Sequence, residues 1–317
     1  VSGGTLAIGS YSDTVGALTV SGGSVTGTTG VLTGSSYNVT NTTGTTTISA
    51  ILGGSAALTK TGAGILSLSG ANTYTGATLI SAGTLTVSGS LSNTTAVTVD
   101  AGTTYNVNAS DTIGSITGTG SVSTSSSGNK TLTVGYDASS TNFGGDISDG
   151  SGQLSLTKTG AGTFTLSGAN TYSGVTTIST GTLVVPGSLS DSTALTIASG
   201  ATYGVDATDT VGSIAGAGSI TTTSAGAKTL TVGYNNGTTS YTGLLSDGSG
   251  SLALNKVGSG TLTMSGSNTY SGSTTVTAGT LAIGSSAAIS TGTINFSGGT
   301  LKLFNTTDLS SRFSTSS

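Results

Sequence analysis

The sequence predicts an all-β fold, a parallel β-solenoid in which each coil takes about 20 residues. Three observations lead to this prediction: a composition poor in helix formers, an internal repeat of 98 residues, and short runs in which polar and apolar residues alternate. Glu is absent and Lys and Arg are scarce, whereas Thr, Val, Ile and Tyr favour strands and 54 Gly favour turns. Disorder needs low hydrophobicity with high net charge, and this chain has a mean hydropathy of +0.22 with 6% charged residues.

The composition also excludes several classes of function. Cys and His are absent, so disulfides, thiol nucleophiles, His general bases and zinc sites built on these ligands cannot form. Seven basic residues and a net charge of −4 argue against nucleic acid, which needs clustered Lys and Arg. Apolar runs are too short for membrane insertion of this segment. No cofactor site is predicted.

The internal repeat sets the expected domain organisation. Residues 59–76 return almost unchanged at 157–174 and more loosely at 255–272, so that Lys60, Lys158 and Lys256 are each 98 residues apart. We expect residues 1–317 to form one continuous solenoid, a segment of a longer protein. Its predicted parts are a degenerate copy at 1–82, full copies at 83–180 and 181–278, and a partial copy at 279–317.

Short strands separated by Gly are predicted within each copy, among them 83–87, 96–99, 130–134 and 162–166. A period of two places Leu85 and Val87 on one face and Thr84 and Thr86 on the other. A barrel or an immunoglobulin-like sandwich closes after a fixed set of strands, whereas a repeat that runs on without linkers favours a solenoid. Small aliphatic side chains would fill the core, Thr, Ser and Asn would face outward, and Gly would form the corners.

Residues 156–183, LTKTGAGTFTLSGANTYSGVTTISTGTL, closely resemble the autotransporter-associated β-strand repeat, also called the passenger-associated transport repeat. Residues 58–85 and 254–281 are further matches. The resemblance implies a right-handed parallel β-helix in a large bacterial protein that is secreted or displayed on the cell surface, often an adhesin. It also implies a role of the repeat in export, through stepwise folding of the passenger outside the cell.

The chain departs from that family in having no C-terminal membrane barrel and no signal peptide, and residues 299–313 look like the opening of another repeat. A solenoid with two open ends exposes strand edges, which favours self-association end to end.

Carboxylates in Gly-rich turns are weak candidates for a metal site. Asp146 and Asp149 have the look of a calcium loop. Asp247 persists one repeat later, but Leu244 replaces the first carboxylate. We therefore expect turn residues that cap their own backbone rather than cation ligands.

A carboxylate pair for glycoside cleavage could be built from Asp206 and Asp209, with Asp111 one repeat earlier. Asn108 replaces the first of these in the preceding copy, and the sole Arg, Arg312, is near the C-terminus. Turn residues are again the preferred interpretation.

Other repeated side chains also allow a functional and a structural interpretation. Tyr74, Tyr172 and Tyr270 follow Asn-Thr in turns and could form a row for carbohydrate stacking, although covering the end of the core is preferred. The repeated Lys residues are expected to be solvated. Thr-x-Thr triplets could form an ice-binding face, but their irregular spacing favours ordinary outward Thr.

The sequence thus predicts a structural or adhesive stalk or passenger segment without catalysis, extracellular or on the bacterial cell surface. Its expected partners are surface glycans, a host or abiotic surface, or further copies of itself. One alternative is a self-assembling filament, sheath or surface-layer subunit. An alternative from another class is a β-helix that binds or cleaves carbohydrate.

Overall fold

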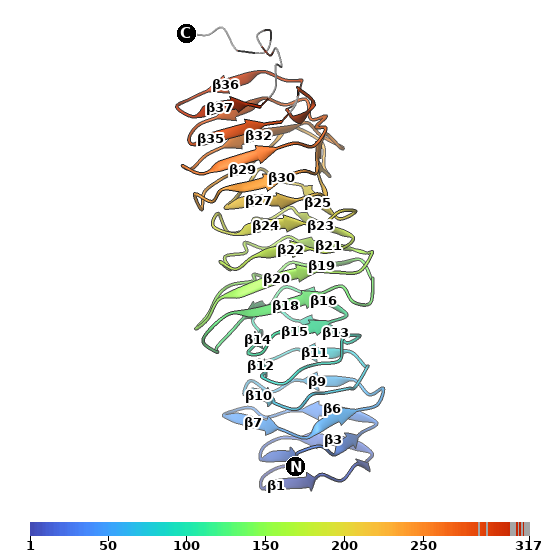
Figure 1. The fold of residues 1–317 in the computed structure, drawn as a ribbon. Coiled ribbons are helices and arrows are strands. Elements are labelled where there is room, and N and C mark those ends of the chain that lie inside the picture. Colours follow the sequence, from blue (N-terminus) through green and yellow to red (C-terminus); the bar gives the residue numbers. More distant parts are fainter. Residues whose placement is uncertain (285, 290, 305–308, 310, 312, 314–317) are drawn as a thin grey trace. The chain divides into compact units, whose positions relative to one another are not determined.

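The computed structural model describes residues 1–284, 286–289, 291–304, 309, 311 and 313 (Figure 1). The chain forms two compact units, Val1–Gly162 and Thr163–Ser317. Each unit is a parallel β-solenoid with about 20 residues per turn, which confirms the predicted fold class. Part of the segment 299–313, including Arg312, lies outside the described residues.

The first unit stacks its strands in four ladders. One ladder consists of β1 (Thr5–Gly9), β4 (Ser24–Gly27), β7 (Thr45–Ile48), β10 (Ile65–Leu68), β12 (Thr84–Val87), β14 (Thr104–Val107) and β17 (Ser121–Ser123). A second consists of β3 (Ala17–Val20), β6 (Ser36–Val39), β9 (Leu58–Lys60), β11 (Thr78–Ile80), β13 (Ala96–Val99), β16 (Ser115–Gly118) and β19 (Thr141–Phe143). The shorter ladders are β2 (Asp13–Thr14), β5 (Val31–Thr33) and β8 (Ile51–Gly53), and β15 (Asp111–Ile113), β18 (Lys130–Val134) and β20 (Leu154–Lys158).

The second unit has three ladders. The first consists of β21 (Thr163–Leu166), β23 (Thr182–Val185), β25 (Thr202–Val205), β28 (Ser219–Thr222) and β31 (Leu244–Ser246). The next consists of β22 (Thr176–Ile178), β24 (Ala194–Ile197), β27 (Ser213–Gly216), β30 (Thr239–Tyr241), β33 (Thr261–Met264), β35 (Thr280–Ile283) and β37 (Thr300–Leu303). The last consists of β26 (Asp209–Val211), β29 (Lys228–Val232), β32 (Leu252–Lys256), β34 (Thr274–Val276) and β36 (Ile294–Phe296).

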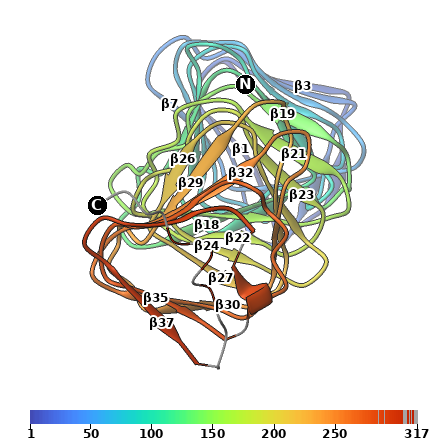
Figure 2. The ribbon, with the colours of Figure 1, turned by 90° about the horizontal axis from the view of Figure 1, so that it is seen from above.

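Neighbouring strands in a ladder pair in parallel, each one coil after the last. Thr84 lies opposite Thr104, and Lys130 lies opposite Leu154, so the coil length varies around the average. In Figure 2, β35 and β37 lie over one another, as their pairing requires. A 3₁₀ turn, η1, spans Ser286–Ala288, and no helix in the described residues has the length and apolar character to cross a membrane.

The core of each unit is a set of side-chain files that run from coil to coil. In the first unit, Leu66, Leu85 and Tyr105 occupy matching positions in β10, β12 and β14 and are fully buried. In the second unit, Phe164 and Leu183 begin a similar file. Each such side chain contributes roughly 1.5–3 kcal/mol through burial, so stability is spread along the stack.

The sequence repeat is also a structural repeat. The four predicted strands appear as β12, β13, β18 and β21, with their bounds as predicted or one residue shorter. Leu85 and Val87 are buried as the period of two indicated, and Thr84 and Thr86 are partly exposed. The bounds of β13, Ala96–Val99, return 98 residues later in β24, Ala194–Ile197.

Glycine has two roles in the coils: it adopts the backbone angles of the turns, and it lets the backbones of adjacent coils come close together. Gly118 has a φ of 107°, which favours glycine, and an added Cβ would lie 2.0 Å from the carbonyl oxygen of Val99. At Gly145, an added Cβ would lie 1.7 Å from the carbonyl oxygen of Gly120 in the preceding coil. Backbone cannot yield as a flexible side chain can, so a larger residue must push the two coils apart.

We predict that Gly145→Ala lowers the free energy of unfolding of the first unit by about 2–3 kcal/mol, because of this overpacking. Urea unfolding followed by circular dichroism measures the change. Gly16→Ala is the matched control, since a Cβ there meets nothing within 4 Å, and it should stay within about 0.5 kcal/mol of the parent. Equal effects in the two variants would contradict the close coil contact.

Candidate functional site

The repeated tyrosines of the Asn-Thr-Tyr turns lie inside the core. Tyr74, Tyr172 and Tyr270 are 0% exposed. The Tyr74 hydroxyl hydrogen-bonds to the Thr78 hydroxyl four residues later at 2.7 Å, and the other two tyrosines repeat this bond. No ring face of the three is open to a sugar, so a carbohydrate row cannot be formed by these side chains as they stand.

The Asn of the same turns joins the turn to adjacent coils. In the first unit, Asn72 accepts a hydrogen bond from the Leu52 backbone N–H at 3.1 Å through Oδ1. Its Nδ2 donates to the carbonyls of Gly70 and Ser90 at 2.9 and 3.0 Å. Asn268 has similar bonds in the second unit, with Leu245 and Ala288 at 2.7 Å each. The turn motif is therefore structural: the Tyr fills the core, and the Asn pairs with backbone groups of adjacent coils.

Two of the weak calcium candidates accept hydrogen bonds from backbone N–H groups of their own turns. Asp149 accepts a hydrogen bond from the Leu154 N–H at 2.7 Å, and Asp247 accepts the equivalent bond from Leu252. Asp146 is exposed. Across the described part of the chain, no three acidic side chains gather in a group that could hold a metal ion.

The carboxylates considered for glycoside cleavage have separate environments. Asp209 is 5% exposed and accepts a hydrogen bond from the Tyr203 hydroxyl at 2.9 Å. Asp206 is partly exposed and accepts a bond from the Thr223 hydroxyl on the following coil at 3.0 Å. Asp111 repeats the buried arrangement in the first unit, with its Oδ2 accepting bonds from the Leu91 N–H at 3.1 Å and from a Tyr hydroxyl at 3.4 Å.

Burial changes the acidity of these Tyr–Asp pairs. Desolvation raises the pKa of Asp111 and of Asp209 to about 6, although hydrogen bonds from Tyr and backbone N–H groups oppose the change. Desolvation and the nearby carboxyl also raise the pKa of Tyr105 and Tyr203 well above the usual value. Each Tyr–Asp pair thus places a titratable carboxyl in the core of its own unit.

The repeated lysines are buried, which corrects the expectation that they are solvated. Lys60, Lys158 and Lys256 are at most 1% exposed. The ammonium group of Lys256 donates to the carbonyls of Val257, Gly258 and Ala278 at 2.5, 3.0 and 3.3 Å. The other two ammonium groups also bond backbone carbonyls of their own turns.

Burial lowers the pKa of all three lysines. The burial itself could have been read from the sequence, because Lys158 follows Leu154 and Leu156 at even spacing in β20 and so shares their inward face.

Comparison with known families identifies the repeat. The family model of the passenger-associated transport repeat matches residues 58–87, 156–185 and 254–283. Three segments of the chain thus match this repeat, at the places where the sequence resembles it. No curated protein and no solved structure matched.

We predict that the protein loses stability as the pH rises from about 4 to 7. In that range the folded state binds more protons than the unfolded state, because the two buried carboxyls titrate near 6 and unfolded Asp titrates near 3.8. Each carboxyl would contribute up to about 3 kcal/mol to the loss. Urea midpoints measured across this range give the slope.

The double variant Asp111→Asn with Asp209→Asn should flatten that slope, whatever its stability at any one pH. Asp206→Asn is the control, since its side chain lies at the surface of the coil, and it should keep the slope of the parent. A slope that survives in the double variant would exclude these two groups as its source.

We also predict that Lys256→Met lowers the free energy of unfolding by on the order of 2 kcal/mol. Three backbone carbonyls lose their donor, and this loss outweighs the gain from removing a buried charge. Lys228→Met is the control, because that Lys is partly exposed and donates to the Ala225 carbonyl. Thermal and urea unfolding measure both, and a Lys256→Met protein at least as stable as the parent would refute the role.

Proposed function

We propose that this chain, three segments of which match the passenger-associated transport repeat, is a structural and adhesive stalk segment in the passenger of a bacterial surface protein, and that it performs no catalysis. The observation that carries the proposal is the position of the repeats within the solenoid. The match at 58–87 spans β9 to β12, and the match at 254–283 spans β32 to β35. In each unit the repeat is one part of an ordinary stack of coils.

The surface of the units supports a role in display rather than chemistry. Outward positions carry Thr, Ser and Asn, as in the file Thr84, Thr104 and Ser121. The chain has no His, Cys or Glu, and Asp149 caps its own turn while Asp209 lies in the core. A hydroxyl-rich face with few charges can hold other groups at a distance without reacting with them.

Resistance to proteolysis is a second property that suits a stalk outside the cell. Trypsin cleaves after Lys and Arg, of which the chain has seven. Lys60, Lys158 and Lys256 are buried among backbone carbonyls, and Lys302 is exposed near the C-terminus. Cleavage in the folded protein should therefore spare the three buried Lys residues, whereas Lys130 and Lys228, which are partly exposed, and Lys302 stay open to the protease.

We predict that antibodies raised against the purified chain label intact cells of the source bacterium as strongly as permeabilised cells. Trypsin treatment of intact cells should leave most of this signal, because Lys60, Lys158 and Lys256 are buried in the coils. A cytoplasmic protein probed in parallel should be labelled only after permeabilisation. Heat-denatured protein, digested alongside, should be cleaved at all its Lys residues.

Labelling that needs permeabilisation would refute the surface location. Rapid cleavage of the folded protein after Lys60, Lys158 or Lys256 would refute the protected stalk, even if the protein were on the surface.

A further inference from the structure

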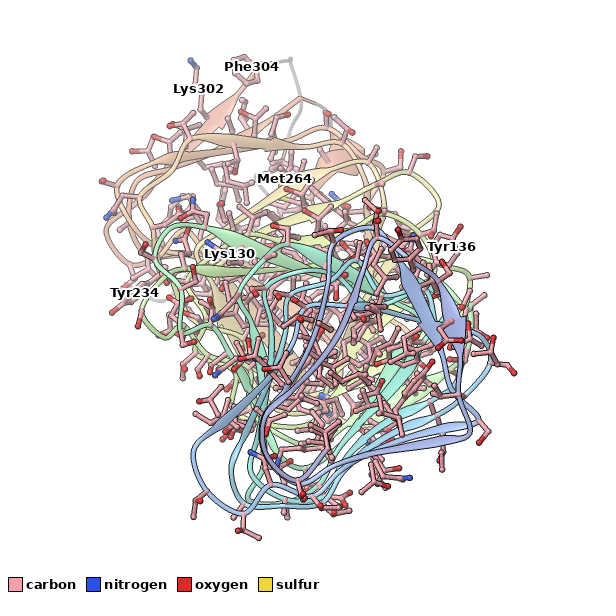
Figure 3. All side chains as sticks on the ribbon, turned by 90° about the horizontal axis from the view of Figure 1, so that it is seen from below. Lys130, Tyr136, Tyr234, Met264, Lys302 and Phe304 are labelled. Carbon is pink, nitrogen blue, oxygen red and sulfur yellow. The ribbon has the colours of Figure 1, made fainter. Side chains whose placement is uncertain are left out.

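The ten tyrosines divide sharply between the core and the surface. Seven are at most 1% exposed, namely Tyr37, Tyr74, Tyr105, Tyr172, Tyr203, Tyr241 and Tyr270. The other three are Tyr11, Tyr136 and Tyr234, which are 80%, 55% and 60% exposed. Figure 3 shows Tyr136 and Tyr234 at the outer margin of the ribbon. The other exposed aromatic rings among the described residues are Phe296, Phe304 and Phe313, close to the C-terminus.

Tyr136 and Tyr234 stand in equivalent turns, here called the first aromatic turn (135–139) and the second aromatic turn (233–237). Each directly follows a strand of its unit, β18 or β29. Ala138 and Asn236, with φ of 58° each, are the two non-glycine residues with positive φ in the described chain, and each lies in one of these turns. The two turns therefore share an uncommon backbone conformation at equivalent positions.

The first aromatic turn is braced by its own side chains. The Asp137 carboxylate accepts hydrogen bonds from the Ser139 N–H at 2.9 Å and from the Ser139 hydroxyl at 2.7 Å. It also accepts a hydrogen bond from Ser115, in the preceding coil. These hydrogen bonds fix the backbone of the turn that carries the Tyr136 ring.

The second aromatic turn has the same bracing with different residues. Asn235 donates to the Ser213 hydroxyl in the preceding coil at 3.1 Å and accepts from the Gly237 N–H at 2.9 Å. Asn236 accepts from the Ser259 N–H in the following coil at 2.8 Å. The two units thus arrive at one arrangement, an exposed Tyr followed by a polar side chain tied to the coil before it.

We propose that the two aromatic turns are binding sites for neutral polysaccharide. The C–H face of a pyranose can stack on the ring of Tyr136 or Tyr234, and its hydroxyls can hydrogen-bond to the polar side chains beside the ring. The ligand is neutral because Asp137 would repel an anion, while Asn235 in the matching turn offers no charge to hold a cation. A rigid ring and a braced turn lose little entropy on binding.

The proposal gives the surface segment a ligand and does not depend on how the protein is exported. If polysaccharide binding fails, labelling of intact cells and resistance to trypsin still decide the stalk function. If the protein is found inside the cell, binding in solution can still be measured. The two ideas therefore fail separately.

Affinity electrophoresis of the full chain in gels containing laminarin, xylan, dextran or hydroxyethyl cellulose tests the proposal. We expect retardation by at least one of these neutral polysaccharides. Tyr136→Ala and Tyr234→Ala should each weaken it, and the double variant should bind at least tenfold more weakly. Tyr136→Phe and Tyr234→Phe should keep the stacking. Tyr11→Ala is the matched control, an exposed Tyr outside the aromatic turns, and should bind as the parent does.

Nitration by tetranitromethane, mapped by mass spectrometry, gives a second readout that needs no variant to fold. Tyr11, Tyr136 and Tyr234 should react, and the retarding polysaccharide should protect the last two and leave Tyr11 reactive. The proposal is overturned if none of the four polysaccharides retards the protein, if the double variant is retarded like the parent, or if all three tyrosines are protected alike.

Discussion

Each coil of a unit is held by backbone hydrogen bonds to the coil before it and the coil after it, and this stacking sets the conditions for everything else. Parallel strands lie about 4.8 Å apart, so each inward side chain sits directly on its partner one coil away, as Leu85 does on Leu66. A column built in this way is narrow. It takes small aliphatic side chains and occasional aromatic ones, and it tolerates no Cβ where backbones meet, as at Gly145.

The same stacking creates a need for buried polar groups. Where the chain leaves a ladder to turn, its carbonyls and N–H groups lose their strand partners, and each unpaired buried group costs free energy. Side chains supply the missing partners: the amide of Asn72 for three backbone groups and the ammonium of Lys256 for three carbonyls. These residues recur with the repeat because the turns that need them recur. The Tyr–Asp pairs, such as Tyr203 with Asp209, place further polar groups in the core.

The alternation of polar and apolar residues predicts the strands, but it did not lead to the prediction that polar side chains lie inside the core. The runs 96–99 and 130–134 alternate clearly, and the structure has strands with those bounds, because alternation is a property of neighbours in the chain. The burial of Lys158 depends on carbonyls that come together only when the turn closes over it. Lys is mostly exposed in folded proteins, and this rule predicts a solvated Lys158. The alternation along its strand predicts the opposite, an inward side chain, and the structure agrees with the alternation. The exposed Tyr136 and the buried Tyr74 both stand near Gly, and the sequence offers no local sign that separates them.

The recurrence of strand bounds every 98 residues has a consequence for how the length of such a protein can change. Residue 181 is Gly, as is residue 83, and β23 follows it as β12 follows the earlier Gly. Loss of residues 83–180 would join β11 to β23, which is equivalent to its present successor, β12. Duplication of those residues would place a second copy of β12 after β22. Unequal crossing-over between repeats in the gene can thus shorten or extend the stack by whole multiples, with each new junction already matched in register. The number of coils is then an evolvable quantity that changes in fixed steps, and each step of 98 residues removes or adds one aromatic turn and one buried Lys.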